Sequence, residues 1–315
     1  MIDSFGRDIN YLRISVTKRC NLNCSYCTDG KSEPEKELTA PQIEKIARVF
    51  AHFGIKKIRL TGGEPLVRED IAEIAERLCG IDGIEKVAIT TNGVLLEKYA
   101  EALKKAGVKG VNISLDTTDA VQYARITGAD CIDRVFRSIE TAKQVGLSPI
   151  RINAVLIKGE NDNSAKELIN LARDSRIDVR FIELMPFSES GREKRVVTGD
   201  EILTQFPFLV PFENKKGSFE QSVARYYTAD GFKGRVGLIT PVSHNFCHEC
   251  NRIRLLSNGK IRPCLGNNSE FDLLEVLDDE SALYERVREA ILAKPEAHLF
   301  NCGYGKFHGM NNIGG

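Results

Sequence analysis

The chain has 315 residues, of which 42% are apolar and 28% charged, and its 44 basic residues balance 44 acidic ones. This composition is typical of a globular protein with a large core, and the balanced charge argues against a surface built for duplex nucleic acid. No apolar run approaches the ~20 residues of a membrane span, and the N-terminus lacks a signal-peptide pattern. Nine cysteines, an odd number, indicate metal ligation in a reducing compartment. We therefore expect a cytoplasmic protein.

Short apolar runs alternate with longer amphipathic ones from about residue 10 to 184. The runs are rich in Ile, Val and Leu and predict strands covered on both faces, at Tyr11–Val16, Lys57–Thr61, Lys86–Thr90, Val111–Leu115, Ile150–Leu156 and Val179–Leu184. Helices are expected between them, and Thr39 with Gln42 forms the pattern of a capping box. Six strand-then-helix units predict an α/β fold, an incomplete (β/α)6 TIM-like barrel with a parallel sheet.

The pattern changes after Pro186. Residues 187–224 are polar and irregular, which predicts a linker or lid. Short strands are expected at Arg225–Thr228 and Arg235–Ile239, and a helix at about Ser281–Leu292. We expect two domains, a barrel over residues 1–220 and a C-terminal region over residues 221–315 that covers the barrel's open side.

Two cysteine triads carry the strongest chemical signal. The first triad is Cys20, Cys24 and Cys27, directly after the first predicted strand; the second triad is Cys247, Cys250 and Cys264. Each triad offers three thiolates where a cubane iron–sulfur cluster has four irons, so one iron would stay open to another ligand. Of the other cysteines, Cys79 and Cys131 are interpreted as small core residues and Cys302 as spare.

A structural zinc site is the competing interpretation of each triad. Zinc sites of this kind use four ligands, and no fourth Cys or His lies near the first triad. His244 and His248 lie near the second triad, so a zinc knuckle remains open there.

Glycines and arginines add a second signal. Gly62-Gly63-Glu64-Pro65 follows the second predicted strand, where glycine lets the main chain approach a ligand closely. Arg13 and Arg59 lie inside apolar strands, where an unpaired charge is costly, so they predict an anion inside the barrel. Arginines bind phosphate bidentately, and three more are candidates: Arg151, Arg252 and Arg254.

The segments CNLNCSYC and GGEP resemble the radical S-adenosylmethionine superfamily. Together with the CHEC…C triad that encloses RIR and the terminal NNIGG, they resemble the GTP 3′,8-cyclase family of molybdenum cofactor biosynthesis, across essentially the whole chain. The resemblance implies a lyase that converts GTP into (8S)-3′,8-cyclo-7,8-dihydroguanosine 5′-triphosphate with two [4Fe–4S] clusters and S-adenosyl-L-methionine. It also implies a homodimer, a reducing electron donor and a downstream pterin-forming enzyme, with no nucleic-acid or membrane partner.

The resemblance implies a role for each matching residue. The first triad would hold the cluster that works with S-adenosylmethionine, and the second triad a cluster whose open iron binds guanine. Cofactor contacts would come from Tyr26, Gly63, Ser114 and Met185. GTP contacts would come from Arg13, Arg59, Thr90, Arg151, Arg252 and Arg254. The tail residues Gly314 and Gly315 would reach the active site, while Thr28-Asp29 departs from the Met-Pro common in the family.

Two further interpretations remain open. One is a radical enzyme with an auxiliary cluster that modifies a peptide or another small molecule. The other is a non-enzymatic iron–sulfur carrier or zinc-stabilised scaffold, which leaves GGEP and the strand-borne arginines unexplained.

Overall fold

The computed structural model describes residues 1–27, 36–187, 196–213, 223–300 and 309–314. Its strands are β1 (Tyr11–Ser15), β2 (Lys57–Thr61), β3 (Lys86–Thr91), β4 (Val111–Ser114), β5 (Ile150–Leu156), β6 (Ile177–Glu183), β7 (Val210–Pro211), β8 (Arg225–Thr228), β9 (Val236–Ile239), β10 (Arg252–Leu255), β11 (Lys260–Arg262) and β12 (Phe271–Asp272). Its α-helices are α1 (Ala40–His52), α2 (Ile71–Cys79), α3 (Leu96–Lys105), α4 (Ala120–Thr127), α5 (Ile132–Gln144), α6 (Ala165–Asp174), α8 (Gly199–Gln205), α9 (Glu280–Leu292) and α10 (Met310–Ile313). Short 3-10 turns are η1 (Pro65–Val67), η2 (Asp162–Ser164), η3 (Cys247–Glu249) and η4 (Leu274–Val276).

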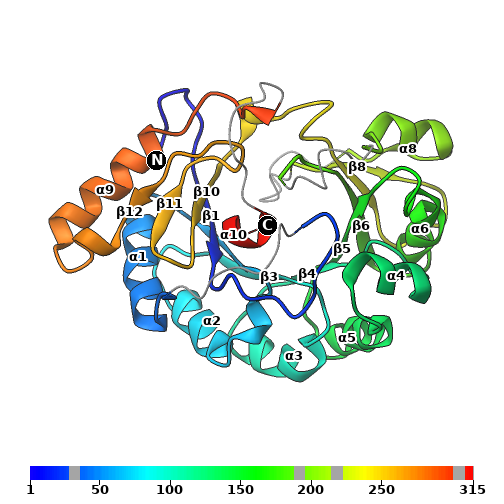
Figure 1. Ribbon diagram of the computed structural model, residues 1–315, viewed down its shortest axis with the longest axis horizontal. Helices are drawn as coiled ribbons and strands as arrows, with labels where there is room; N and C mark the ends of the chain where they lie inside the picture. The colour runs from blue at the N-terminus through cyan, green and yellow to red at the C-terminus, as the bar shows by residue number, and fades with distance from the viewer. Residues whose placement is uncertain (28–35, 188–195, 214–222, 301–308, 315) are drawn as a thin grey trace.

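The strands form one curved sheet in the order β12-β11-β10-β1-β2-β3-β4-β5-β6-β9-β8-β7. Strands β1 to β6 are neighbours in chain order, and each pairs in parallel with the next. Figure 1 shows helices α1 to α6 around the outside of this sheet and α10 inside it. The predicted fold class, an incomplete TIM-like barrel, is confirmed.

The strands that follow β6 in the chain extend the barrel wall on both sides. Strand β10 pairs in parallel with β1, and β9 pairs in parallel with β6. Strands β11 and β12 continue one edge, and β8 and β7 the other, all antiparallel. Because β10 starts beside Tyr11, the second triad lies near the beginning of β1, whereas the first triad follows its end. At ~3.3 Å per residue, roughly 13 Å of strand separates the two ends.

Local sequence signals account for the helices around this wall. Thr39 caps α1 in the predicted capping box with Gln42, and α1 buries Ile43, Ile46 and Phe50 against the sheet. The expectation of irregular chain over residues 187–224 is wrong in part, since α8 begins with a second capping box at Thr198.

The remaining composition-based expectations concern membranes and cysteines. Within the described ranges, no helix has the length and apolar character that crossing a bilayer requires. Cys79 and Cys131 are partly buried and pack against the core, as predicted for small apolar side chains. Cys302 lies outside the described residues.

Candidate functional site

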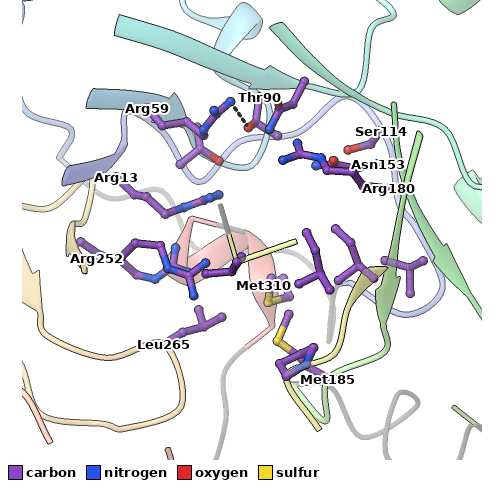
Figure 2. A pocket seen from close by; sticks show the side chains of 18 of the residues that line it. Arg13, Arg59, Thr90, Ser114, Asn153, Arg180, Met185, Arg252, Leu265 and Met310 are labelled. Carbon is purple, nitrogen blue, oxygen red and sulfur yellow. Dashed lines mark hydrogen bonds between the residues drawn. The ribbon is translucent and has the colours of Figure 1, made fainter. Parts of the chain in front are cut away.

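Both cysteine triads line one cavity of about 380 Å³ inside the barrel. This volume falls in the ~300–1,000 Å³ range of small-molecule sites. Every cofactor and GTP contact that the resemblance implies, from Tyr26 to Arg254, also lines it. Figure 2 shows Arg13, Arg59 and Arg252 on one side of this space and Ser114 with Arg180 on the other. The structure therefore brings together residues that lie far apart in the sequence.

The GGEP segment packs directly against the loop that leads to the first triad. The backbone N–H of Gly63 donates to the carbonyl oxygen of Thr17 at 2.7 Å. A Cβ on Gly63 would lie 2.4 Å from the carbonyl oxygens of Lys18 and Arg19, and one on Gly62 would lie 2.6 Å from that of Thr17. Only glycine allows this approach, so the two glycines set where the triad loop sits on the end of β2.

Two buried carboxyl groups brace the first triad. Asp116, after β4, accepts a hydrogen bond from the Tyr26 hydroxyl at 2.7 Å and another from the backbone N–H of Val155 at 2.8 Å. Burial raises the pKa of Asp116 to about 6. Burial and the neighbouring Asp116 raise the pKa of Tyr26 well above its ordinary value, so its hydroxyl remains the donor.

Glu64 is the second of these carboxyl groups. It accepts from the backbone N–H of Leu66 at 3.0 Å, the Thr91 hydroxyl at 2.7 Å and the backbone N–H of Asn92 at 2.6 Å. Burial raises its pKa to about 7. The side-chain amide of Asn92 donates to the side-chain oxygen of Asn21 at 2.8 Å, and its nitrogen lies 3.9 Å from the Cys20 sulfur. Glu64 thus joins the ends of β2 and β3, and it holds Asn92 in place beside Cys20.

The second triad has cationic surroundings instead. Burial alone raises the pKa of the Cys250 thiol, but Arg252 and Lys294 outweigh burial and lower it to about 6. The Arg252 guanidinium lies 3.9 Å from the Cys250 sulfur. Burial raises the pKa of Cys264, and Lys294 opposes this shift. The two cations therefore favour the thiolate form at Cys250, and Lys294 acts in the same direction at Cys264; the thiolate is the form in which cysteine binds metal.

The nearby histidines do not complete a zinc knuckle at the second triad. His244 pairs with Asp200 at 2.9 Å, and His248 is exposed beside Glu249. Within the described part of the chain, no three His, Cys, Asp or Glu side chains form a group that could hold one metal ion. Thiolates of a cubane cluster each bind a different iron, so they face a shared volume and not a shared point.

Three arginines form a row across neighbouring strands. Arg13 on β1 is in register with Arg254 on β10 and with Arg59 on β2, so all three side chains share one face of the sheet. We call Arg13, Arg59 and Arg254 the arginine row. Burial, together with neighbouring positive charges, lowers the pKa of Arg13 to about 10 and that of Arg254 well below its ordinary value. A buried row of positive charge favours an anionic ligand.

The other predicted GTP contacts lie beside this row. The Arg59 guanidinium donates to the Thr90 hydroxyl at 3.4 Å, as the dashed line in Figure 2 marks, and also to the Tyr11 hydroxyl. Arg151 on β5 lies 3.6 Å from the Asp178 carboxylate, which also pairs with Arg235 at 2.7 Å. Part of the charge of Arg151 is therefore already balanced within the protein.

Arg180 on β6 is a site residue that sequence reasoning missed. It is in register with Asn153 on β5, which is in register with Ser114 on β4, and all three line the cavity. Burial lowers the pKa of Arg180 to about 10, and its buried Nε has no hydrogen-bond partner among the described residues. The signal was present in the sequence, because Arg180 lies inside an apolar run just as Arg13 and Arg59 do.

The C-terminal tail reaches the cavity, and Met310 lines it. The backbone N–H of Met310 donates to the carbonyl oxygen of Cys27 at 2.8 Å, and the carbonyl oxygen of Gly314 accepts from Arg254 at 2.7 Å. Gly314 is buried and adopts a φ of 68°, which favours glycine. The tail therefore contacts the first triad and the arginine row. Gly315, Thr28 and Asp29 lie outside the described residues.

The residues present fit two iron–sulfur clusters and a cationic cofactor. All six triad cysteines are free thiols facing one cavity. The first triad has two buried carboxyl groups nearby, Glu64 and Asp116, whose ionised forms would favour the positive charge of S-adenosylmethionine. The second triad has buried cations that suit thiolate ligands. Between them, the arginine row suits phosphate.

Family comparisons agree with this geometry. Residues 14–172 match the radical SAM superfamily, and residues 177–300 match the family described as Molybdenum Cofactor Synthesis C. The chain is 44% identical to a GTP 3′,8-cyclase of Alkaliphilus oremlandii over the full length of both chains. It is also 44% identical to a GTP 3′,8-cyclase of Clostridium acetobutylicum, with 96% of this chain and 95% of that protein covered.

Solved structures show the same fold at much lower identity. Streptococcus suis SuiB bound to S-adenosylmethionine aligns with a TM-score of 0.59 at 22% identity, covering 89% of this chain and 68% of that one. SuiB bound to its precursor peptide SuiA aligns with a TM-score of 0.58 at 21% identity, covering 92% and 72%. The identity to the GTP 3′,8-cyclases is about twice the identity to SuiB, so the cyclases identify the family within the superfamily to which the chain belongs. The chain belongs to the radical S-adenosylmethionine superfamily and, within it, to the GTP 3′,8-cyclase family.

Proposed function

We propose that this protein converts GTP into (8S)-3′,8-cyclo-7,8-dihydroguanosine 5′-triphosphate, the first step of molybdenum cofactor biosynthesis, using S-adenosylmethionine and two [4Fe–4S] clusters. One observation carries the proposal: the two triads and the arginine row line a single cavity. A radical source alone needs one triad. A second triad and a row of buried arginines at a distance from the first suit a large anionic substrate.

The first triad would hold the cluster that acts with S-adenosylmethionine. When bound, this pair supplies the one-electron chemistry that removes a hydrogen atom from an unactivated carbon. Tyr26, Gly63, Ser114 and Met185 would line the cofactor, and all four lie on the cavity wall. The close packing of Gly63 on the triad loop fixes this part of the cavity wall beside the proposed cofactor position.

The arginines would bind the phosphates of GTP. Arg13, Arg59 and Arg254 present positive charge from three adjacent strands, and we add Arg180 from the opposite wall. Thr90 is oriented by Arg59, and Arg151 and Arg252 complete the predicted contacts. Bidentate arginine–phosphate pairs in a buried site fix orientation as well as affinity.

The second triad would hold the guanine end of GTP. Cys247, Cys250 and Cys264 supply three ligands, so the fourth iron remains available to the base. Anchoring GTP by base and phosphates at once would hold the ribose C3′ near C8 of the same nucleotide. Such positioning lowers the entropic part of the barrier to joining the two carbons.

The tail would close the space around the ribose. Gly314 is placed by Arg254 and Met310 by Cys27, so this segment lies between the first triad and the arginine row. Gly314 and Gly315 are the predicted catalytic tail residues. A backbone without side chains there would shield the reacting carbons from water and still leave room for the substrate.

The family resemblance also supports proposals about organisation and partners. The barrel domain is proposed to cover residues 1–220 and the substrate-binding C-terminal region residues 221–315. The protein is proposed to act in the cytoplasm as a homodimer, to receive electrons from a reducing donor and to deliver its product to a pterin-forming enzyme.

Turnover with and without GTP tests the proposed function. Anaerobically reconstituted protein would be incubated with S-adenosylmethionine and dithionite, and the products analysed by mass spectrometry. The expected result is 5′-deoxyadenosine that rises with GTP, together with a new species isomeric with GTP. Deoxyadenosine formed equally without GTP, and no isomer, would contradict the assignment of the substrate.

A further inference from the structure

Lys294 ties together the two chain segments that carry the second triad. It lies two residues after α9, is 2% exposed and lines the cavity. Its Nζ donates to the carbonyl oxygen of Arg252 at 2.7 Å and to that of Pro263 at 2.9 Å. Arg252 is two residues after Cys250, and Pro263 directly precedes Cys264. One ammonium group therefore sets the spacing between the segments of these two cysteines.

The backbone around Lys294 is itself held by the N-terminal segment. The Arg7 guanidinium donates to the carbonyl oxygens of Pro295 at 2.8 Å, Glu296 at 3.0 Å and Lys294 at 3.4 Å. It also donates to the carbonyl oxygen of Cys247 at 3.0 Å. Arg7 thus connects Cys247, the remaining cysteine of the second triad, to the segment that carries Lys294.

Arg7 is in turn neutralised within its own segment. Its Nε pairs with the Asp3 carboxylate at 2.6 Å, and both side chains are at least 94% buried. Because Asp3 balances Arg7, this ion pair leaves the charge of Lys294 uncompensated.

Among the described residues, the negative charge nearest in kind to the Lys294 ammonium is that of the second triad's thiolates. The two hydrogen-bond acceptors of Lys294 are neutral carbonyls, and no carboxylate in the described ranges forms an ion pair with it. An isolated buried ammonium is strongly destabilising. Burial lowers the pKa of Lys294, and the thiolate forms of Cys250 and Cys264 oppose this shift. Three thiolates around a cubane cluster would supply the negative charge that this position lacks.

We propose that Lys294 is a positioning residue for the second cluster: it holds the Cys250 and Cys264 segments together and keeps a positive charge beside their sulfurs. The inference rests on the proposed second cluster and goes beyond the ligands themselves. Reduction adds negative charge to a cluster, and a fixed positive charge nearby favours it. Lys294 therefore raises the reduction potential of the second cluster relative to the same site without the charge.

Three variants separate the roles of charge and anchoring. Lys294→Met removes both the charge and the two hydrogen bonds, Lys294→Gln removes the charge but keeps an N–H donor, and Lys294→Arg keeps the charge. Lys166→Met is the matched control, since Lys166 is exposed on α6. Each protein is reconstituted anaerobically, and its iron and sulfide content and the midpoint potential of each cluster, followed by electron paramagnetic resonance, are measured.

The expected result is specific to one cluster. Lys294→Met loses the second cluster or shifts its potential downward, while the first cluster keeps its content and potential as an internal measure of folding. Lys294→Gln lowers the potential of the second cluster, Lys294→Arg restores it, and Lys166→Met matches the wild type. Should Lys294→Met fail to fold, Lys294→Gln and Lys294→Arg give the comparison by themselves.

Two results would overturn the inference, and a third would overturn its basis. Lys294→Met and Lys294→Gln with both clusters at wild-type potentials would exclude the role of the charge. Equal loss of both clusters in all three variants would indicate a general requirement for folding. Wild-type protein that holds only one cluster would instead contradict the proposed second cluster.

Discussion

Arg254 donates a 2.7 Å hydrogen bond to the backbone carbonyl oxygen of Gly314, which joins the arginine row to the C-terminal tail. The other end of the tail is fixed by the bond from Met310 to the carbonyl oxygen of Cys27. A segment of five residues therefore spans from the first triad to the proposed phosphate site. In the proposed site, the arginine that places the tail also binds GTP.

Gly314→Ala is expected to displace the tail and strongly reduce product formation. The φ of 68° makes alanine unfavourable there by about 1–3 kcal/mol. The new Cβ would also lie 2.7 Å from the Cβ of Ser15 on the barrel wall. Because α10 spans only Met310–Ile313, its displacement should change the thermal midpoint of unfolding little. Product formation and thermal unfolding measure the two effects separately.

Gly231→Ala is the matched control for this change. Gly231 has a φ of 79°, and a Cβ there would meet nothing within 4 Å. It should lose stability from the same backbone strain and retain full activity. Full activity in Gly314→Ala would show that the tail tolerates a side chain and plays no part in the reaction.

Arg180→Met is expected to weaken GTP binding without destabilising the free protein. The side chain carries a buried charge whose Nε has no described partner, so its removal relieves a desolvation penalty in the absence of ligand. Loss of a buried arginine–phosphate contact should weaken GTP binding by at least about tenfold, or about 1.4 kcal/mol. Equilibrium binding and thermal unfolding would be measured beside Arg176→Met, an exposed arginine near the same strand. Equal GTP affinity in the two variants would remove Arg180 from the site.

Tyr26→Phe is expected to loosen the first triad. It removes a 2.7 Å hydrogen bond to the buried Asp116 carboxyl group, an interaction typically worth about 1.5–3 kcal/mol when one partner is charged. S-adenosylmethionine binding should weaken, because Tyr26 lines the proposed cofactor position. In a double-mutant cycle with Asp116→Asn, the two effects should fall well short of additivity. Simple addition would mean that the Tyr26–Asp116 bond has no energetic role.

Glu64→Gln is expected to change the pH dependence of stability. Burial raises the pKa of Glu64 from 4.5 to about 7, so between these values the folded state binds more protons than the unfolded state. Stability from this group is therefore present at low pH and lost as pH rises from about 4.5 to 7, by up to about 3 kcal/mol. Denaturant unfolding of both proteins at each pH should show the wild type losing stability relative to Glu64→Gln over this window. Parallel profiles would contradict the shift.

The sequence predicted the barrel because its elements are local. Lys57–Thr61 and Ile150–Leu156 form strands with the predicted bounds, and the capping box at Thr39 starts a helix as expected. The sequence did not predict that β10 would join β1 and β9 would join β6, because these pairings depend on contacts between segments far apart in the chain. They place the second triad at the end of the barrel opposite the first.

Site residues could be predicted from the sequence where a charged side chain lies inside an apolar strand. Arg13 and Arg59 were recognised as charges inside apolar strands, and Arg180 carried the same signal without being selected. Lys294 and Arg7 carried no signal. Their partners are backbone carbonyl oxygens, and a sequence pattern does not encode which distant carbonyls a side chain will reach. Anchors of this kind emerge only from the fold.

Transfer of a hydrogen atom from C3′ of GTP tests the central claim most directly. The protein would be incubated with S-adenosylmethionine, dithionite and GTP that carries deuterium at C3′, and the 5′-deoxyadenosine analysed by mass spectrometry. If the cavity holds the ribose C3′ beside the first triad, deoxyadenosine should gain one deuterium. Deoxyadenosine that forms in response to this GTP but contains no deuterium would contradict the proposed placement of the substrate.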